Sequence, residues 1–531
     1  KKENGASRQY NYDFEGNLIS ERNEVGKVQS YVYDGEHNVV ELTNFSGKKD
    51  SFKHDFSNNT ETFSYSDGNW AKISRNPLGL ITKMEGNSFC YRYRYDDYGK
   101  LLKFIDDKTD VEVEYKYDVY GRCIEKKAPS FVFIYQYDEC GRINKISENI
   151  SGIGIDIKYD SRSRKTEMVY SNGIETRWKY NKIGLLESCV TKNQIGEILN
   201  ADFILYDENN RINFVCDKDG NYRKYDYDSD GKLISEKQKL TPDIVEFYKN
   251  EAIDCGLYLD SKNTGAAVFN IDYSDYDAIN QVMKNAGIEN VKVQLNQPVW
   301  VQNYQYTSEG NVKSAENIFG KISYEYDIAG RLCLKRCQNT ESEGMKFEWD
   351  DDNCLTKISN KDKEIRFVYN SQKRPVSIIE KDIALNEYKV DEYKYDAFGR
   401  RIQHTDSDGV VKNIVYDGFS TCVLECYVLM ENGESNIKYA AGNVDYGDDF
   451  DNFRRVDDSK YKAFENSKGL HPPVAETYPE TYPETYKSFD SSQFDISQNE
   501  KKAKTKSAKN DNSYAVLNFA CVPLVYINFS S

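Results

Sequence analysis

The histidines and cysteines of this chain, which could bind a metal or act as nucleophiles, are scattered along it. Its four histidines are not spaced from one another as ligand pairs: His37, His54, His404 and His471. Two cysteine pairs have three intervening residues, a spacing that on a strand places both sulfurs on one face: Cys333 with Cys337, and Cys422 with Cys426. We therefore predict no metal site, no histidine-based triad, no other catalytic residue and no cofactor site.

Carboxylates are abundant, but a structural role in turns explains those that occur at regular spacing. The stretch Val111 to Lys126 reads VEVEYKYDVYGRCIEK, and its first half alternates apolar with charged residues, as a strand with one buried face does. Asp118 and Gly121 then occupy the first and fourth positions of a type I turn. The residues from Arg122 onward predict the returning strand of a β-hairpin with a glycine bulge. Asp118 and Arg122 are four residues apart, a spacing that lets them pair across the turn.

The same unit recurs along most of the chain, at steps of mostly 20 to 23 residues. Degenerate copies, such as Tyr33-Asp34 and Tyr369-Asn370, fill the gaps between clear copies. We assign a structural role in the turn to the motif residues of the clear copies, which are Tyr12, Asp13, Gly16, Tyr95, Asp96, Gly99, Tyr117, Asp118, Gly121, Arg122, Tyr137, Asp138, Gly141, Arg142, Tyr227, Asp228, Gly231, Tyr326, Asp327, Gly330, Arg331, Tyr395, Asp396, Gly399 and Arg400.

The number of hairpins predicts the architecture. Seventeen units would supply about 34 strands, and at about 4.8 Å per strand a flat sheet would be about 160 Å wide. Open twisted sheets seldom exceed about ten strands without curling. The predicted fold is therefore all-β: tandem hairpins coiled into a spiral or barrel-like hollow shell, with one small α/β insertion.

The motif Tyr-Asp-x-x-Gly-Arg/Lys-Leu/Ile at this spacing resembles the YD repeat of Rhs proteins, which are bacterial polymorphic-toxin and cell-surface proteins related to the Tc-toxin cocoon and the teneurin shell. The resemblance covers Tyr10 to Gly418. It implies a hollow β shell that often encloses a C-terminal toxin, and an extracellular or cell-surface location. Relatives often cut themselves at a segment bearing Asp-Pro; this chain has no Asp-Pro dipeptide, so self-processing is not predicted.

The domain organisation follows the repeats. We predict a first shell block over 1–238, an α/β insertion over 239–300 and a second shell block over 301–419. The insertion should contain a helix beginning near Pro242, a helix over Tyr276 to Ala286 and a strand over Val291 to Leu295. A C-terminal region over 420–531 holds a low-complexity linker at about 474–513 and a short apolar tail. Because the sequence starts at Lys1, close to the first repeat, we interpret it as part of a longer protein.

Composition limits the possible partners. The net charge is −16 and the pI about 5.0, which disfavours nucleic acid. The aromatic content is 14%, with 43 tyrosines, a composition typical of sheet surfaces. The apolar tail, Tyr514 to Phe529, is interrupted by Pro523 and is too short for a membrane span.

The predicted function is a non-enzymatic shell that sequesters a polypeptide, either a toxin or the chain's own C-terminal segment. One alternative is a surface adhesin or carbohydrate-binding array, in which exposed tyrosines would bind a cell-surface glycan or protein. A second is a polymorphic toxin with its activity in 420–531, where the sequence shows no recognisable enzyme constellation.

Overall fold

The structure is a computed structural model of the 531-residue chain. It describes residues 7–149, 152, 154–239, 273–286, 299–317, 319–338, 343–421, 423–429, 435–443 and 451–454. The predicted first helix of the insertion, the strand over Val291 to Leu295, the low-complexity linker and the apolar tail lie outside these residues. The four-part domain division stays a prediction.

The described chain forms one antiparallel sheet of 36 strands, in which each strand pairs with the next strand in sequence. This confirms the predicted all-β fold. The first run of strands is β1 Gln9–Tyr12, β2 Leu18–Arg22, β3 Val28–Tyr33, β4 Val39–Thr43, β5 Lys49–Asp55, β6 Thr60–Ser64, β7 Trp70–Arg75, β8 Ile81–Gly86, β9 Cys90–Tyr95, β10 Leu101–Asp106, β11 Val111–Tyr117, β12 Cys123–Ala128, β13 Phe131–Tyr137, β14 Ile143–Glu148, β15 Gly154–Tyr159, β16 Lys165–Tyr170, β17 Glu175–Tyr180, β18 Leu186–Lys192, β19 Ile198–Tyr206, β20 Ile212–Asp217, β21 Tyr222–Tyr227 and β22 Leu233–Lys239.

One helix and a second run of strands follow. The helix α2 spans Tyr273–Asn285, three residues earlier at its start than predicted. The strands are β23 Val299–Tyr306, β24 Val312–Asn317, β25 Gly320–Tyr326, β26 Leu332–Cys337, β27 Met345–Trp349, β28 Leu355–Ser359, β29 Lys363–Tyr369, β30 Pro375–Asp382, β31 Glu387–Tyr395, β32 Arg401–Thr405, β33 Val411–Tyr416, β34 Val423–Leu429, β35 Ser435–Asn443 and β36 Asp451–Arg454.

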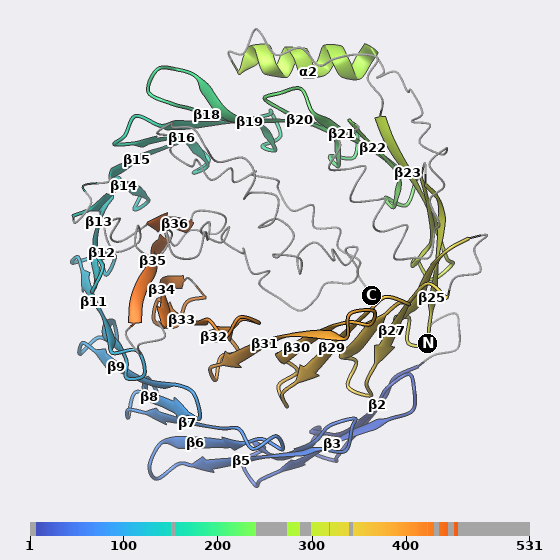
Figure 1. Ribbon diagram of the computed structural model, residues 1–531. Coiled ribbons are helices and arrows are strands. Elements are labelled where there is room, and N and C mark those ends of the chain that lie inside the picture. Colours follow the sequence, from blue (N-terminus) through green and yellow to red (C-terminus); the bar gives the residue numbers. More distant parts are fainter. Residues whose placement is uncertain are drawn as a thin grey trace.

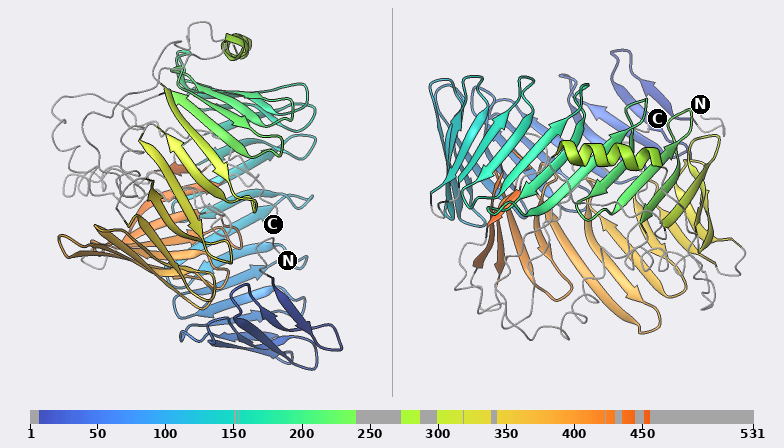
Figure 2. Two further views of the ribbon diagram at one scale, coloured as in Figure 1. Left: turned by 90° about the vertical axis from the view of Figure 1, so that its right-hand side faces the viewer. Right: turned by 90° about the horizontal axis from the view of Figure 1, so that it is seen from above.

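The sheet winds into an unclosed spiral. Strands β1 to β23 run around the ring, and we call them the outer coil; strands β27 to β36, the inner coil, continue inside the arc of the first strands (Figure 1). The inner coil is also displaced from the outer coil along the axis of the spiral (Figure 2). Right-handed twist accumulated over successive hairpins explains the curvature, and the displacement lets the second coil pass the first without closing a barrel.

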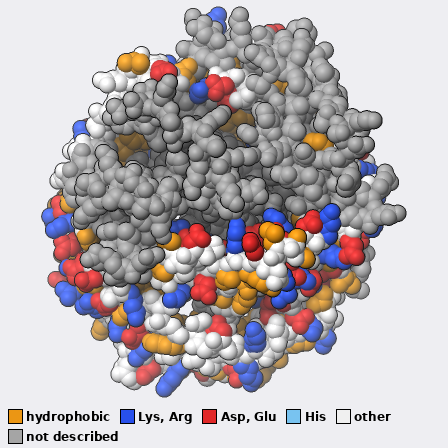
Figure 3. Space-filling model, in the orientation of Figure 1, with side chains coloured by type: hydrophobic (Ala, Val, Ile, Leu, Met, Phe, Trp, Pro, Cys, Tyr) orange, Lys and Arg blue, Asp and Glu red, His pale blue; other side chains and the backbone are white. Residues whose placement is uncertain are grey.

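The two faces of the outer coil differ because side chains alternate along each strand. The concave face of the outer coil is the face that meets the inner coil. On it, apolar side chains of neighbouring strands lie side by side and form a row, which we call the apolar row. Its buried members include Phe104, Val113, Tyr115, Tyr135, Ile146, Ile155, Ile157, Met168 and Trp178. The convex face carries ion pairs instead, such as Lys116 with Glu125 at 2.7 Å. Where the described residues are visible in Figure 3, acidic and basic side chains are interspersed.

Helix α2 lies outside the ring, against the convex face of β18 and β19 (Figure 1). Ile279 and Met283 are almost fully buried, and they pack with Phe203 and Phe214 of the wall. These wall residues are on the opposite face of β19 and β20 from the concave row, as the register requires. The described part of the insertion therefore decorates the shell.

Two carboxylates face each other on the concave side of β19 and β20. Asp202 is the cross-strand neighbour of Asp217, and it is 8% exposed. Burial first, and then the charge of Asp217, raise the pKa of Asp202 to about 6. The carboxyl group of Asp202 therefore binds its proton more tightly in the folded chain than in the unfolded chain. The stability contributed by Asp202 is therefore largest below about pH 4 and falls as the pH rises from about 4 to about 6.

We predict that Asp202→Asn stabilises the protein at about pH 7.5 by about 1–2 kcal/mol, and that this gain disappears at about pH 4. Local stability of β19 and β20, measured by amide hydrogen exchange at both pH values, checks this. Asp156→Asn, a change at a carboxylate whose side chain is 61% exposed, is the matched control and should have little effect. An Asp202→Asn gain that is equal at both pH values would contradict the assignment.

Candidate functional site

The repeated turn is built around its aspartate. In the unit of Asp138, the carboxylate oxygen Oδ1 accepts the backbone N–H of Arg142 at 2.9 Å, and Oδ2 accepts Nε of the same arginine at 2.7 Å. These bonds lower the pKa of Asp138, the side-chain bond from Arg142 being the largest cause. The fourth turn residue, Gly141, has φ of 81°, which glycine adopts without strain. The predicted glycine bulge lies at Gly141 and Arg142, whose backbone groups both bond to Asp138. The register shift at Tyr137 is a second irregularity, which skips Asn144 of the returning strand.

The arginine of one turn reaches forward to the next hairpin. The guanidinium of Arg142 lies 4.6 Å from the ring centroid of Tyr159, and its Nη1 donates to the backbone carbonyl of Asp160 at 3.2 Å. The same stacking recurs where Arg or Lys follows the turn, over the repeat tyrosine or tryptophan of the next unit: Lys100 on Tyr117, Arg122 on Tyr137, Arg164 on Tyr180, Arg211 on Tyr227, Lys232 on Tyr306, Arg331 on Trp349 and Arg400 on Tyr416.

The hydroxyl of the repeat tyrosine bonds to the preceding hairpin. The hydroxyl of Tyr159 donates to the carbonyl of Ile143, the first residue of the preceding returning strand, at 2.7 Å. Twelve further repeat tyrosines make the same bond: Tyr33, Tyr95, Tyr117, Tyr137, Tyr180, Tyr206, Tyr227, Tyr306, Tyr326, Tyr369, Tyr395 and Tyr416. Asp, Arg, the next Tyr and this carbonyl together form what we call the inter-hairpin clasp.

The sequence-predicted motif residues all lie in these turns, but their surroundings differ. The tyrosines at 95, 117, 137, 227, 326 and 395 lie between neighbouring hairpins with their hydroxyls bonded. Tyr12 is 59% exposed. Gly16, Gly99, Gly121, Gly231, Gly330 and Gly399 have positive φ, and Asp13, Asp96, Asp118, Asp228 and Asp327 accept backbone N–H groups of their own turns. Asp396 and Arg400 form the most buried pair, with side chains 0% and 4% exposed.

Turns of the inner coil pack against the outer coil along a line that we call the seam. Asp352 accepts the backbone N–H of Phe45 at 3.1 Å, and Asp67 accepts that of Ser371 at 2.9 Å. Further along, Phe419 stacks on Tyr93 with ring centroids 4.4 Å apart. The seam thus begins as a polar contact between turns and becomes a contact of inner-coil turns with the apolar concave face.

A buried charge pair ends the seam. Lys126 of β12 donates to Asp417, which follows β33, and the hydroxyl of Tyr115 donates to the other oxygen of the same carboxylate at 2.5 Å. Burial raises the pKa of Tyr115, and the Asp417 charge raises it further. Burial alone would lower the pKa of Lys126, but the carboxylate outweighs it and raises this pKa. Sequence reasoning missed this cluster, since Lys126 and Asp417 are 291 residues apart.

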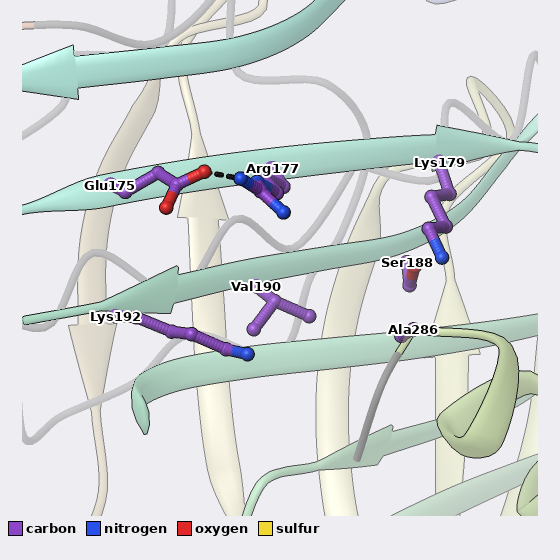
Figure 4. Close-up of a pocket in the computed structure, with 7 residues that line it drawn as sticks. All are labelled: Glu175, Arg177, Lys179, Ser188, Val190, Lys192 and Ala286. Carbon is purple, nitrogen blue, oxygen red and sulfur yellow. Dashed lines mark hydrogen bonds and ion pairs between the residues drawn. The ribbon is translucent and has the colours of Figure 1, made fainter. Parts of the chain in front are cut away.

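A shallow hollow, open to solvent, lies on the convex face beside the end of α2. Glu175, Arg177 and Lys179 of β17 line it together with Val190 of β18 (Figure 4). Arg177 pairs with Glu175 and with Glu167, and Lys179 donates to the backbone carbonyl of Asn285 in the helix. Arg177 and Lys179 therefore stabilise the wall and the contact between the wall and α2.

Two further findings concern the described residues only. No group of three or more His, Cys, Asp or Glu side chains among them could hold a metal ion. Within the same part of the chain, no helix is long and apolar enough to span a membrane.

One family model matches part of the wall. Residues 90–204 match the family model described as the teneurin YD-shell, a stretch that runs from β9 into β19. A search of curated proteins finds no match. The resemblance to YD-repeat shells is thus confirmed over these residues.

The chain is also similar to the solved complex titled TcdB2-TccC3, at 12% identity and a TM-score of 0.42, and to the Photorhabdus luminescens Tc holotoxin pore, at 13% identity and a TM-score of 0.39. Each comparison covers 79% of this chain and 21% of the other, so the chain spans about a fifth of those proteins. A porin-like protein from Bacteroides uniformis is similar at 11% identity and a TM-score of 0.14, over 51% of this chain and 90% of the other.

We predict that Tyr159→Phe weakens the clasp by about 1 kcal/mol, because the carbonyl of Ile143 loses its donor. The local measurement is amide exchange in β14 and β15, which should become about fivefold faster. Tyr98→Phe is the control, since this turn-tip side chain is 89% exposed. Combining Tyr159→Phe with Arg142→Ala should cost less than the sum of the two single changes if the groups act together; strict additivity would contradict the clasp.

We predict that Asp417→Asn opens the seam, because it leaves the Lys126 ammonium buried without its counter-ion, at about 3–5 kcal/mol. The double variant Lys126→Met with Asp417→Asn should regain most of this loss. Amide exchange in β11 and β33 reports both effects. Asp107→Asn, which breaks the exposed pair with Arg92, should change stability by at most about 1 kcal/mol. Equal effects of Asp417→Asn and Asp107→Asn would show that the pair of Lys126 and Asp417 does not hold the seam closed.

Proposed function

We propose that this chain is a wall of a hollow shell that sequesters a polypeptide, either a toxin or its own C-terminal segment over 420–531, outside the cell or at its surface. The observation that carries the proposal is the placement of the apolar row on the concave face, while ion pairs occupy the convex face. The members of this row are buried, part of them by the inner coil, so the interior of the wall is an apolar environment that would favour a partly unfolded chain and keep proteases away from it.

The clasps argue against the adhesin alternative. Thirteen repeat tyrosines use their hydroxyls on the neighbouring hairpin, and several of their rings are covered by Arg or Lys. A sugar platform needs an exposed ring face, and a covered ring does not provide one. The toxin alternative concerns 420–531, most of which lies outside the described residues, and it stays a prediction.

Limited trypsin digestion of the full chain tests the proposal. The basic run from Lys501 to Lys509 supplies cleavage sites within the segment proposed as guest. We expect these sites to be cut at least about tenfold more slowly in the full chain than in an isolated peptide of the same sequence, and Asp417→Asn to remove much of that protection. Asp107→Asn is the matched control and should leave the protection intact.

Two outcomes would count against sequestration of the chain's own segment. Cleavage at Lys501 to Lys509 at the rate of the free peptide would show that this segment is not sheltered. Protection that survives Asp417→Asn, in a variant whose seam is shown to be open by exchange in β11 and β33, would show that the shelter does not come from the shell.

A further inference from the structure

Strand β31 of the inner coil is longer than the strand that follows it, and one of its edges is open over part of its length. β31 has nine residues and β32 has five. β32 pairs with β31 only over Glu392 to Tyr395. In the described sheet, the stretch from Glu387 to Asp391 therefore has β30 on one side and no strand on the other. This opening lies within the second run of strands, away from both ends of the described chain (Figure 1).

The open stretch is exposed to solvent. The side chains at 387–390 are all exposed, among them Tyr388 at 57% and Val390 at 39%. At about 3.4 Å per residue the stretch spans about 17 Å, which is the length of an ordinary strand. An exposed edge of this length is a template for another strand, unless its charges prevent the pairing.

The direction of the backbone groups follows from the turn after β31. The N–H of Asp396 donates to the last residue of this turn, and so it faces β32. Because backbone groups alternate along a strand, those of Tyr388 and Val390 face the same way, toward the open side. Glu387 and Lys389 direct theirs toward β30, with which they are paired. Side chains alternate too, so Tyr388 and Val390 share one face of the sheet, and Glu387 and Lys389 share the other.

The charges of this edge are complementary to those of a second copy of the same edge. Two such strands, paired antiparallel about a two-fold axis at Tyr388, place each Glu387 opposite Lys389 of the other copy. The two Tyr388 residues then exchange backbone hydrogen bonds, and their rings lie side by side. A two-fold axis at Lys389 would instead place the two lysines opposite each other, and Glu387 opposite Asp391, so like charges disfavour that register.

We propose that the chain forms a two-fold symmetric dimer through the open edge of β31, which joins the sheets of the two copies. The tip of the β30–β31 hairpin, where Ile383 is 44% and Leu385 66% exposed, would then lie beside the β32–β33 turn of the other copy. A contact of this kind closes on itself, so it produces a dimer and not a fibre. The inference goes beyond sequestration, because it assigns a contact between two walls.

Charge reversal at the two facing positions tests the dimer. Analytical ultracentrifugation of the full chain at about 1–100 µM should show an equilibrium between monomer and dimer. Glu387→Lys places lysines opposite each other, and Lys389→Glu places glutamates opposite each other, so each change should weaken self-association about tenfold. An equal mixture of the two variants should restore association, because both facing pairs of the mixed dimer are then of opposite charge.

Two further measurements separate this edge from other causes of association. Glu343→Lys is the matched control, a charge reversal at a side chain that is 81% exposed and outside the edge, and it should leave association unchanged. Amide exchange at a concentration where the dimer dominates should slow at Tyr388 and Val390. Exchange at Glu387 and Lys389 should not change, since these amides face β30 in the monomer as well.

The outcomes that overturn the dimer are specific. A chain that stays monomeric at about 100 µM overturns it, and so does self-association that neither charge reversal weakens. A mixture that associates no more tightly than either variant alone also overturns it. Protection of Tyr388 and Val390 in the monomer would assign the edge to another segment of the same chain and overturn the second copy. None of these readouts depends on trypsin protection of Lys501 to Lys509, so the dimer and the proposed sequestration can fail separately.

Discussion

The clasp between neighbouring hairpins is the interaction on which the rest of the structure depends. A hairpin by itself is marginal in water, and its backbone ladder alone leaves register and tilt weakly specified. In each clasp the aspartate fixes the turn and orients the arginine, the arginine covers the next tyrosine, and that tyrosine bonds back to the carbonyl beside the arginine. Every contact is modest, but it links a unit to the next one with the same geometry. Repetition of one fixed relation between neighbours is what produces a smooth spiral.

The seam uses a different kind of interaction. Most clasp pairs are partly exposed, as the 24% and 21% exposure of Arg142 and Asp138 shows, so water screens their charges; the buried pair of Asp396 and Arg400 is the exception. Lys126 and Asp417 are only 8% and 9% exposed. At such a buried site, a charge without its counter-ion costs a large amount of free energy. A buried charge pair adds little net stability relative to apolar groups, but it accepts only one alignment of the two coils. We interpret the pair as fixing where the inner coil sits on the outer coil.

The sequence predicted the local features well, because their causes are local. Asp118 and Gly121 specify a turn, the alternation before Tyr117 specifies a strand, and the count of units requires curvature. The sequence assigned the tyrosines a structural role in the turn, but it did not indicate their partners in the neighbouring hairpins. The seam could not be predicted, since it depends on the twist summed over many hairpins: nothing near Lys126 in the sequence indicates Asp417. The local sequence pattern predicted α2 as a helix. Its position outside the wall depends on distant strands and was not predicted.

The pairing of each strand with its sequence neighbours has a consequence for how the molecule is made. A wall of this kind can form progressively during synthesis, hairpin by hairpin, because no strand waits for a distant partner. The contacts of the seam join residues about 300 positions apart, as Tyr115 and Asp417 with a separation of 302 do, so they form after β33 has left the ribosome. Until that moment the spiral remains open on its inner side. A segment encoded further along the same chain therefore emerges while the inner side of the spiral is still closing.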